Sequence, residues 1–119
     1  RGRLTLTEAL TMIEGEFRVH KETMHAYSIF VDRTYNGYDR FFIELRNDGE
    51  DGLYLSDGGS AVHSFDEVEE RDWRALCRAH GFTFHHFRIH HPFTGMEDLY
   101  KFIEFLSLIA DTYDPIEEE

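Results

Sequence analysis

The chain has few of the features that mark exported or membrane proteins. A single cysteine, Cys77, cannot form an internal disulfide, and its helical spacing from Trp73 and Leu76 predicts a small buried hydrophobe. No apolar run is long enough to span a bilayer, and residues 1–4 lack the apolar stretch of a secretory signal. We therefore expect a cytoplasmic protein that makes no membrane contact.

The motifs of most enzyme classes are also missing. There is no phosphate-binding loop and no dinucleotide fingerprint, and neither Ser56 nor Ser60 stands in a nucleophile elbow. The only lysines, Lys21 and Lys101, do not follow a suitable acid as a magnesium-dependent nuclease would require. We therefore expect no catalytic residues and no cofactor.

Basic residues are scarce as well. The 12 lysines and arginines face 24 aspartates and glutamates, which gives a formal charge of −12. Residues 44–72 contain ten acids and only two bases, Arg46 and Arg71. This field disfavours direct nucleic-acid binding, because neutralising phosphates requires clustered lysine and arginine. It favours a basic partner, although an acidic surface also serves solubility alone.

One histidine cluster carries the alternative, enzymatic hypothesis. Its members are His85, His86, His90 and His91. On an extended segment His86 and His90 share a face with Arg88 between them, whereas a metal site needs several nitrogens that converge. We therefore interpret the histidine cluster first as a polar strand or interface, with a bulge or break at residues 85–86. The second interpretation is a small metal-dependent hydrolase or nuclease built on His86 and His90.

The hydrophobic pattern predicts one α+β domain over residues 1–119, with a small antiparallel β-meander and about three α-helices. Alternating residues indicate strands at 27–31, 40–47 and 53–56, and a short strand at 18–20. The acidic tail, residues 115–119, is expected to fray.

Two capping-box patterns predict helix starts. Thr5 and Glu8 precede a helix over residues 6–14, and Ser64 and Glu67 precede a second that ends before Gly81. A third helix begins near residue 94 and ends before residue 115. Asp66, in the second box, is expected to act as a cap whose replacement by alanine costs about 1 kcal/mol.

The predicted strand at 53–56 ends in the corner Asp57, Gly58, Gly59. Asp57 is expected to accept backbone N–H groups, again worth about 1 kcal/mol, and the glycines to adopt positive φ. This Leu-x-Leu-Ser-Asp-Gly-Gly strand end, after a hydrophobic strand and an acidic glycine turn, resembles the prokaryotic and phage family called domain of unknown function eighteen-twenty-eight over residues 27–109. The resemblance implies an α+β fold and a phage or mobile-element origin, but no chemistry.

Aromatic and acidic residues outside the core pattern predict a binding surface. With 11 Phe, 6 Tyr and one Trp, the chain has more rings than one core needs. Tyr35, Tyr38, Phe42 and Tyr54 lie on turns or opposite the aliphatic face, and suit either an interface or a second core layer. The acids without core duty are Asp48, Glu50, Asp51, Glu67, Glu69 and Glu70.

These patterns together indicate a non-enzymatic protein-binding module, monomeric or homodimeric. The resemblance and the charge suggest a phage-encoded inhibitor that occupies the basic surface of a host protein, for example a nucleic-acid-binding defence enzyme, in the manner of an anti-CRISPR or nucleic-acid mimic. An accessory domain of a larger protein is a further alternative.

Overall fold

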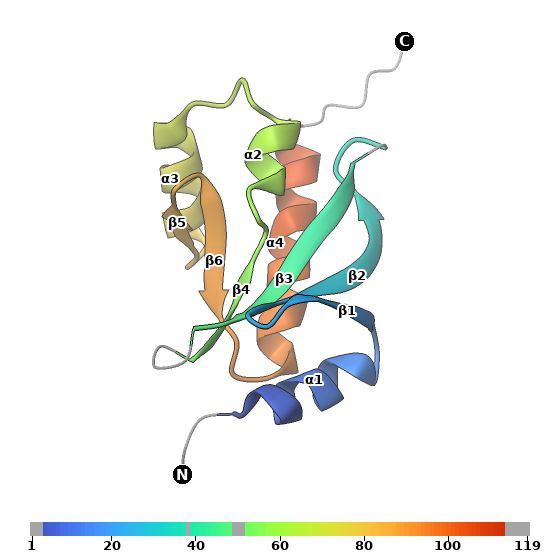
Figure 1. Cartoon of the computed structure of the whole chain (residues 1–119). Helices are drawn as coiled ribbons and strands as arrows, with labels where there is room; N and C mark the ends of the chain where they lie inside the picture. Colours follow the sequence, from blue (N-terminus) through green and yellow to red (C-terminus); the bar gives the residue numbers. More distant parts are fainter. Residues whose placement is uncertain (1–3, 38, 49–51, 114–119) are drawn as a thin grey trace.

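An antiparallel sheet forms the centre of the computed structural model, which describes residues 4–37, 39–48 and 52–113 (Figure 1). Its six strands follow the order β1-β2-β3-β4-β6-β5. They are β1 (Arg18–Thr23), β2 (Ala26–Thr34), β3 (Arg40–Asn47), β4 (Leu53–Ser56), β5 (Thr83–His85) and β6 (Arg88–Pro92). The first four strands form the predicted meander, and β6 with β5 extends the sheet beyond β4.

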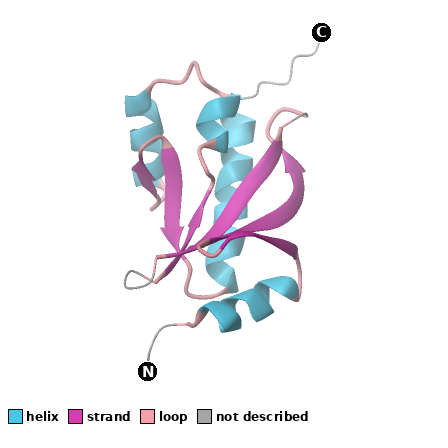
Figure 2. Cartoon of the chain, viewed as in Figure 1, coloured by secondary structure: helices cyan, strands magenta, loops and turns pink. Residues whose placement is uncertain are grey.

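Four helices complete the predicted α+β fold. They are α1 (Leu6–Glu14), α2 (Ser60–Ser64), α3 (Glu70–Ala79) and α4 (Met96–Tyr113). The long helix α4 crosses behind the sheet, so the helices leave the opposite sheet face open (Figures 1 and 2). The core lies between α4 and the sheet, where Ile43, Leu55 and Leu106 are fully buried. Burial of each such side chain contributes about 1.5–3 kcal/mol.

The capping box at α1 is confirmed. The backbone N–H of Glu8 donates to Thr5 Oγ1 at 3.1 Å, and the backbone N–H of Thr5 donates to Glu8 Oε1 at 2.9 Å. The helix runs over residues 6–14 as predicted, and buries Ala9 and Ile13.

The second capping box does not form. A short helix, α2, ends at Ser64, and α3 begins only at Glu70, with no side-chain bond at its N-cap Glu69. The reason is Phe65, which is only 8% exposed and packs edge-on against Tyr35 with ring centroids 5.8 Å apart. Burying this ring turns the chain inward where the local pattern would have started a helix. The predicted cap role of Asp66 is therefore wrong.

The histidine segment is a hairpin, so the predicted break near residues 85–86 is confirmed and the alternative of a bulge is wrong. His86 and Phe87 form the turn, with φ angles of 53° and 60°, and His85 pairs with Arg88 across it. Such two-residue turns require positive φ at both central positions and usually contain glycine or asparagine, so the sequence carried no signal for this one. The hairpin register places His85, Arg88 and His90 on one face of the sheet. In a single extended strand, His85 would lie on the opposite face from Arg88 and His90.

Candidate functional site

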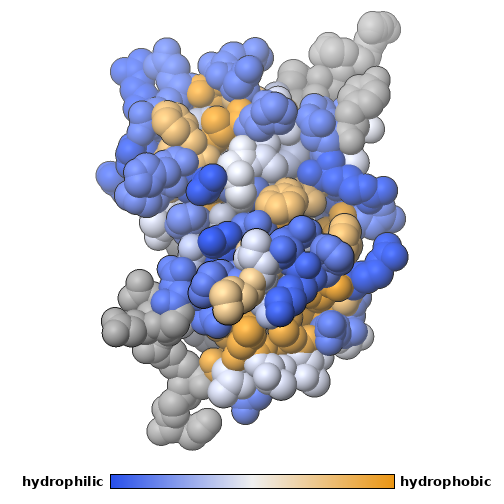
Figure 3. All heavy atoms as spheres, viewed as in Figure 1, coloured by the Kyte–Doolittle hydropathy of each residue, from blue (hydrophilic) through white to orange (hydrophobic). Residues whose placement is uncertain are grey.

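The open face of the sheet carries polar side chains around a shallow hollow. Figure 3 shows this side of the molecule as largely hydrophilic, with hydrophobic residues in separate patches. A depression of about 390 Å³ lies over β3, β4 and β6. We call it the open-face pocket, and its lining residues are Phe42, Glu44, Arg46, Tyr54, Ser56, Gly58, Arg88 and His90.

Charged and hydrogen-bonding groups converge in the open-face pocket. Arg46 donates from Nε to the Tyr54 hydroxyl at 3.2 Å, and its Nη1 lies 3.3 Å from Glu44 Oε1. These two contacts hold the Arg46 guanidinium in a defined orientation. Arg88 forms no ion pair with any described residue. The pocket thus has one oriented cation and one whose charge has no carboxylate partner.

His90 is the titratable group of the pocket nearest to neutral pH. Its ring lies 5.1 Å from that of Tyr54. Burial lowers the pKa of His90 below 6.5, and the positive charges of His85, Arg88 and Arg46 lower it further, whereas Asp48 opposes them. The imidazole is therefore mainly neutral at pH 7 and becomes cationic in more acidic solution.

The predicted Asp57 corner forms one wall of this pocket. Asp57 is completely buried, and its Oδ1 accepts the N–H of Gly59 at 2.9 Å while Oδ2 accepts that of Ala61 at 3.0 Å. A third bond, from Ile89 N–H to Oδ1 at 2.8 Å, joins the corner to β6. Burial raises the pKa of Asp57, and these three bonds oppose the shift. The turn role is confirmed, and the carboxylate also fixes the backbone between Arg88 and His90.

The glycines of the corner allow a close approach. Gly58 has φ of +64°, and a Cβ placed there would lie 2.6 Å from Phe42 Cε2. The Phe42 ring, 38% exposed, therefore packs directly on the Gly58 backbone. Gly59 also has positive φ, +88°, as predicted.

The structure separates the four predicted interface aromatics. Phe42 and Tyr54 do meet at the open-face pocket, and Tyr38 lies outside the described residues. Tyr35 is only 2% exposed, so its predicted role in partner binding is wrong and the core-layer alternative holds for it. Its hydroxyl bonds Ser60 Oγ at 2.9 Å, its ring packs on Phe41, and burial raises its pKa.

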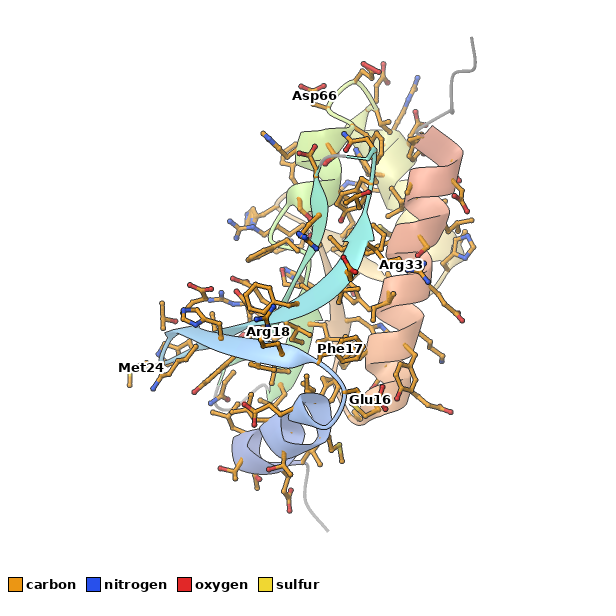
Figure 4. The ribbon with its side chains drawn as sticks, turned by 90° about the vertical axis from the view of Figure 1, so that its right-hand side faces the viewer. Glu16, Phe17, Arg18, Met24, Arg33 and Asp66 are labelled. Carbon is orange, nitrogen blue, oxygen red and sulfur yellow. The ribbon has the colours of Figure 1, made fainter. Side chains whose placement is uncertain are left out.

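Of the predicted acids, Glu67, Glu69 and Glu70 lie at the end of the molecule opposite α1, where Figure 4 labels Asp66. Asp48 follows the other end of β3 from Asp39, so the predicted acids do not form one patch. The Ser64 hydroxyl lies 3.1 Å from Asp39 Oδ2 and joins the β2–β3 turn to the segment between α2 and α3. Glu50 and Asp51 lie outside the described residues, and Asp48 is exposed beside them in the chain. We call the following exposed residues the acidic end: Asp39, Asp66, Glu67, Glu69, Glu70 and Asp72.

The metal hypothesis finds no support in the described residues. No three histidine, cysteine, aspartate or glutamate side chains there come together as metal ligands would. His86 lies in the hairpin turn with its ring 4.0 Å from that of His85, while His90 faces Tyr54. Cys77 is buried as predicted, and burial raises the pKa of its thiol to about 12.

The helices of the described residues were also compared with the length and hydropathy of a membrane span. None of them is long and apolar enough to cross a membrane.

Sequence reasoning missed Glu44, Arg46, Arg88 and His90 as partners in one pocket. Strand alternation already places Phe42, Glu44 and Arg46 on one face. The unrecognised hairpin concealed the approach of Arg88 and His90, because β6 reaches β4 only after the chain has reversed at His86.

Comparison with known proteins adds no assignment. No protein-family model, no curated protein and no solved structure matches the chain. The resemblance drawn from the Asp57 corner stays a prediction.

Proposed function

We propose that the protein is a non-enzymatic binding module whose acidic end occupies the basic surface of a host protein. One observation carries the proposal: Asp66, Glu67 and Asp72 are exposed and form no ion pair with any described residue. Their negative charge is therefore directed to solvent and available to a partner.

The setting of these carboxylates suits electrostatic recognition. Glu69 and Glu70 pair with Arg71 and Arg74, but these pairs are exposed and contribute at most about 1 kcal/mol to folding. Apart from Asp39, which accepts the Ser64 hydroxyl, the acidic end therefore has little structural duty. Its summed field would steer association with a basic groove, and rows of carboxylates can stand in for phosphates there.

A nucleic-acid-binding defence enzyme is the kind of partner that this chemistry fits. Its groove must carry clustered lysine and arginine to neutralise phosphates. An inhibitor of the anti-CRISPR kind, encoded by a phage or another mobile element and acting in the cytoplasm of the host, would exploit that requirement. The proposed origin rests on the resemblance of the Asp57 corner, and the proposed mode of binding rests on the charge.

A charge-reversal experiment tests the proposal. Asp66→Lys with Glu67→Lys changes the acidic end, and Glu14→Lys with Glu104→Lys makes the same change in net charge at exposed positions elsewhere. Quantitative pull-downs from bacterial lysate should recover a nucleic-acid-binding protein with the wild type and the control, and lose it with the first variant. Nucleic acid should compete with the wild type for that protein.

Salt provides a second readout of the same proposal. Attraction between the acidic end and a basic groove is screened over about 8 Å at physiological ionic strength, so affinity should fall steeply as salt rises. A partner that both reversed variants retain equally, at an affinity that salt does not change, would contradict the proposal and direct attention to Phe42 and Tyr54.

A further inference from the structure

We propose that the open-face pocket binds a nucleotide, with its phosphate group held by Arg46 and Arg88 and its base stacked on the exposed face of Phe42. The pocket volume, about 390 Å³, lies within the range of small-molecule sites, about 300–1,000 Å³. This inference does not depend on the acidic end, because the two regions share no residue.

The cations of the pocket supply the phosphate-binding part. Guanidinium groups bind phosphate oxygens through paired N–H donors. Arg46 is already oriented by the Tyr54 hydroxyl and Glu44, and Arg88 has no carboxylate partner among the described residues. Both arginines line the pocket together with His90, and their charges help to lower the pKa of its imidazole. In a chain of net charge −12, this is a local reversal of the field.

The remaining lining residues point to a nucleotide and not to inorganic phosphate. Phe42 presents a ring that is 38% exposed, and an aromatic face of this kind accepts any base by stacking. The Glu44 carboxylate can accept hydrogen bonds from sugar hydroxyl groups, as acidic residues do in other nucleotide sites. Inorganic phosphate would use the two arginines but would leave Phe42 and Glu44 without a ligand contact.

The Asp57 corner preorganises both walls of the pocket. Its carboxylate binds the N–H of Ile89, which fixes the backbone between the two β6 residues of the pocket. Gly58 supports the Phe42 ring from below, at a distance that no side chain would permit. A ligand would therefore meet a site whose parts are already in place, which reduces the entropic cost of binding.

Titration of the ¹⁵N-labelled protein followed by NMR tests the proposal. The ligands are the four ribonucleoside 5′-monophosphates, adenosine and inorganic phosphate. At least one monophosphate should shift the amide signals of Gly58 and Ile89 with a Kd below about 1 mM, and adenosine and phosphate should each bind at least about tenfold more weakly. Arg88→Gln should weaken the binding at least about tenfold, because it removes a charge-assisted contact.

Two controls make the result decisive. Arg71→Gln removes another exposed arginine, at the acidic end, and should leave the Kd unchanged, while the spectra of both variants report folding. A single strand of about ten nucleotides should bind no more tightly than a mononucleotide, because the acidic field repels a longer polyanion. The proposal is overturned if no monophosphate binds below about 1 mM, if phosphate alone binds as tightly, if both arginine variants lose binding equally, or if affinity rises with strand length.

Discussion

The acidic end and the open-face pocket use charge in opposite ways. At the acidic end, carboxylates such as Glu67 stand on a connecting segment and in the first turns of α3, exposed to solvent. In the pocket, Arg46 lies on β3 and His90 on β6, and both strands pair with β4. A buried carboxylate, that of Asp57, fixes the backbone on either side of Ile89. The exposed carboxylates of the acidic end act through their electrostatic field, which salt screens. The charged groups of the pocket act through their fixed positions relative to one another. Replacing Asp57 or Gly58, which build the pocket, should therefore cost stability, whereas replacing an unpaired carboxylate of the acidic end should change only affinity.

The largest expected difference separates two aspartates. Asp57→Ala leaves three backbone N–H groups without their acceptor in a buried corner, and each orphaned donor costs about 1–3 kcal/mol, so the free energy of unfolding should fall by at least about 3 kcal/mol. Asp66→Ala should change it by less than about 0.5 kcal/mol, because this side chain caps no helix. Urea denaturation of both variants measures the contrast. Equal losses in the two would mean that Asp66 has a structural role after all.

Two glycine-to-alanine substitutions compare the stability of the same two regions. Gly58→Ala combines the strain of φ +64° with a clash against the Phe42 ring, and should destabilise the fold by about 2 kcal/mol or more. Gly37→Ala, in the β2–β3 turn near the acidic end, has φ of +88° but no atom within 4 Å of the new Cβ, so only strain of about 1 kcal/mol applies. Thermal unfolding compares them.

A double variant isolates the clash between the new Cβ at position 58 and the Phe42 ring. In a Phe42→Ala background, the cost of Gly58→Ala should fall to that of Gly37→Ala, because only the backbone strain remains. A cost that stays the same in this background would show that Phe42 does not rest on Gly58.

The sequence predicted the elements whose signals are local. The capping box of Thr5 and Glu8, the alternation of residues 40–47 and the Asp57 corner each depend on neighbouring residues, and all three are confirmed. The pattern at Ser64 failed because burial of Phe65 against Tyr35 outweighs a cap worth about 1 kcal/mol. Long-range packing decided that case.

The pocket could be predicted only in part, for a similar reason. Phe42, Glu44 and Arg46 follow from strand alternation, but Arg88 and His90 join them through a hairpin turn formed by residues that seldom adopt positive φ. The bond from Ile89 to Asp57 spans 32 residues and has no local signature. Among the described interface aromatics, Tyr35 was misplaced because it directly follows β2, where alternation no longer indicates which way a side chain points.

A smaller effect on stability is expected at the acidic end itself. The free energy of unfolding of the combined Asp66→Lys and Glu67→Lys variant should differ from that of the wild type by less than about 0.5 kcal/mol per substitution. Both side chains are exposed and make no ion pair with described residues. Chemical denaturation at low and high salt measures this. A loss of several kcal/mol would show that the acidic end supports the fold, and would remove the distinction between the two regions.

The smallest effect concerns the protonation of His90, and it compares two arginines. The positive charge of Arg88 helps to hold the pKa of His90 below 6.5, so Arg88→Gln should raise that pKa, whereas Arg71→Gln at the acidic end should leave it unchanged. Because the folded state disfavours the imidazolium, His90 makes the fold lose stability as the pH falls below 6.5, and Arg88→Gln should reduce this loss. NMR titration of the His90 ring protons gives the pKa directly. A pKa of His90 that does not respond to Arg88→Gln would show that the charge of Arg88 does not reach the imidazole.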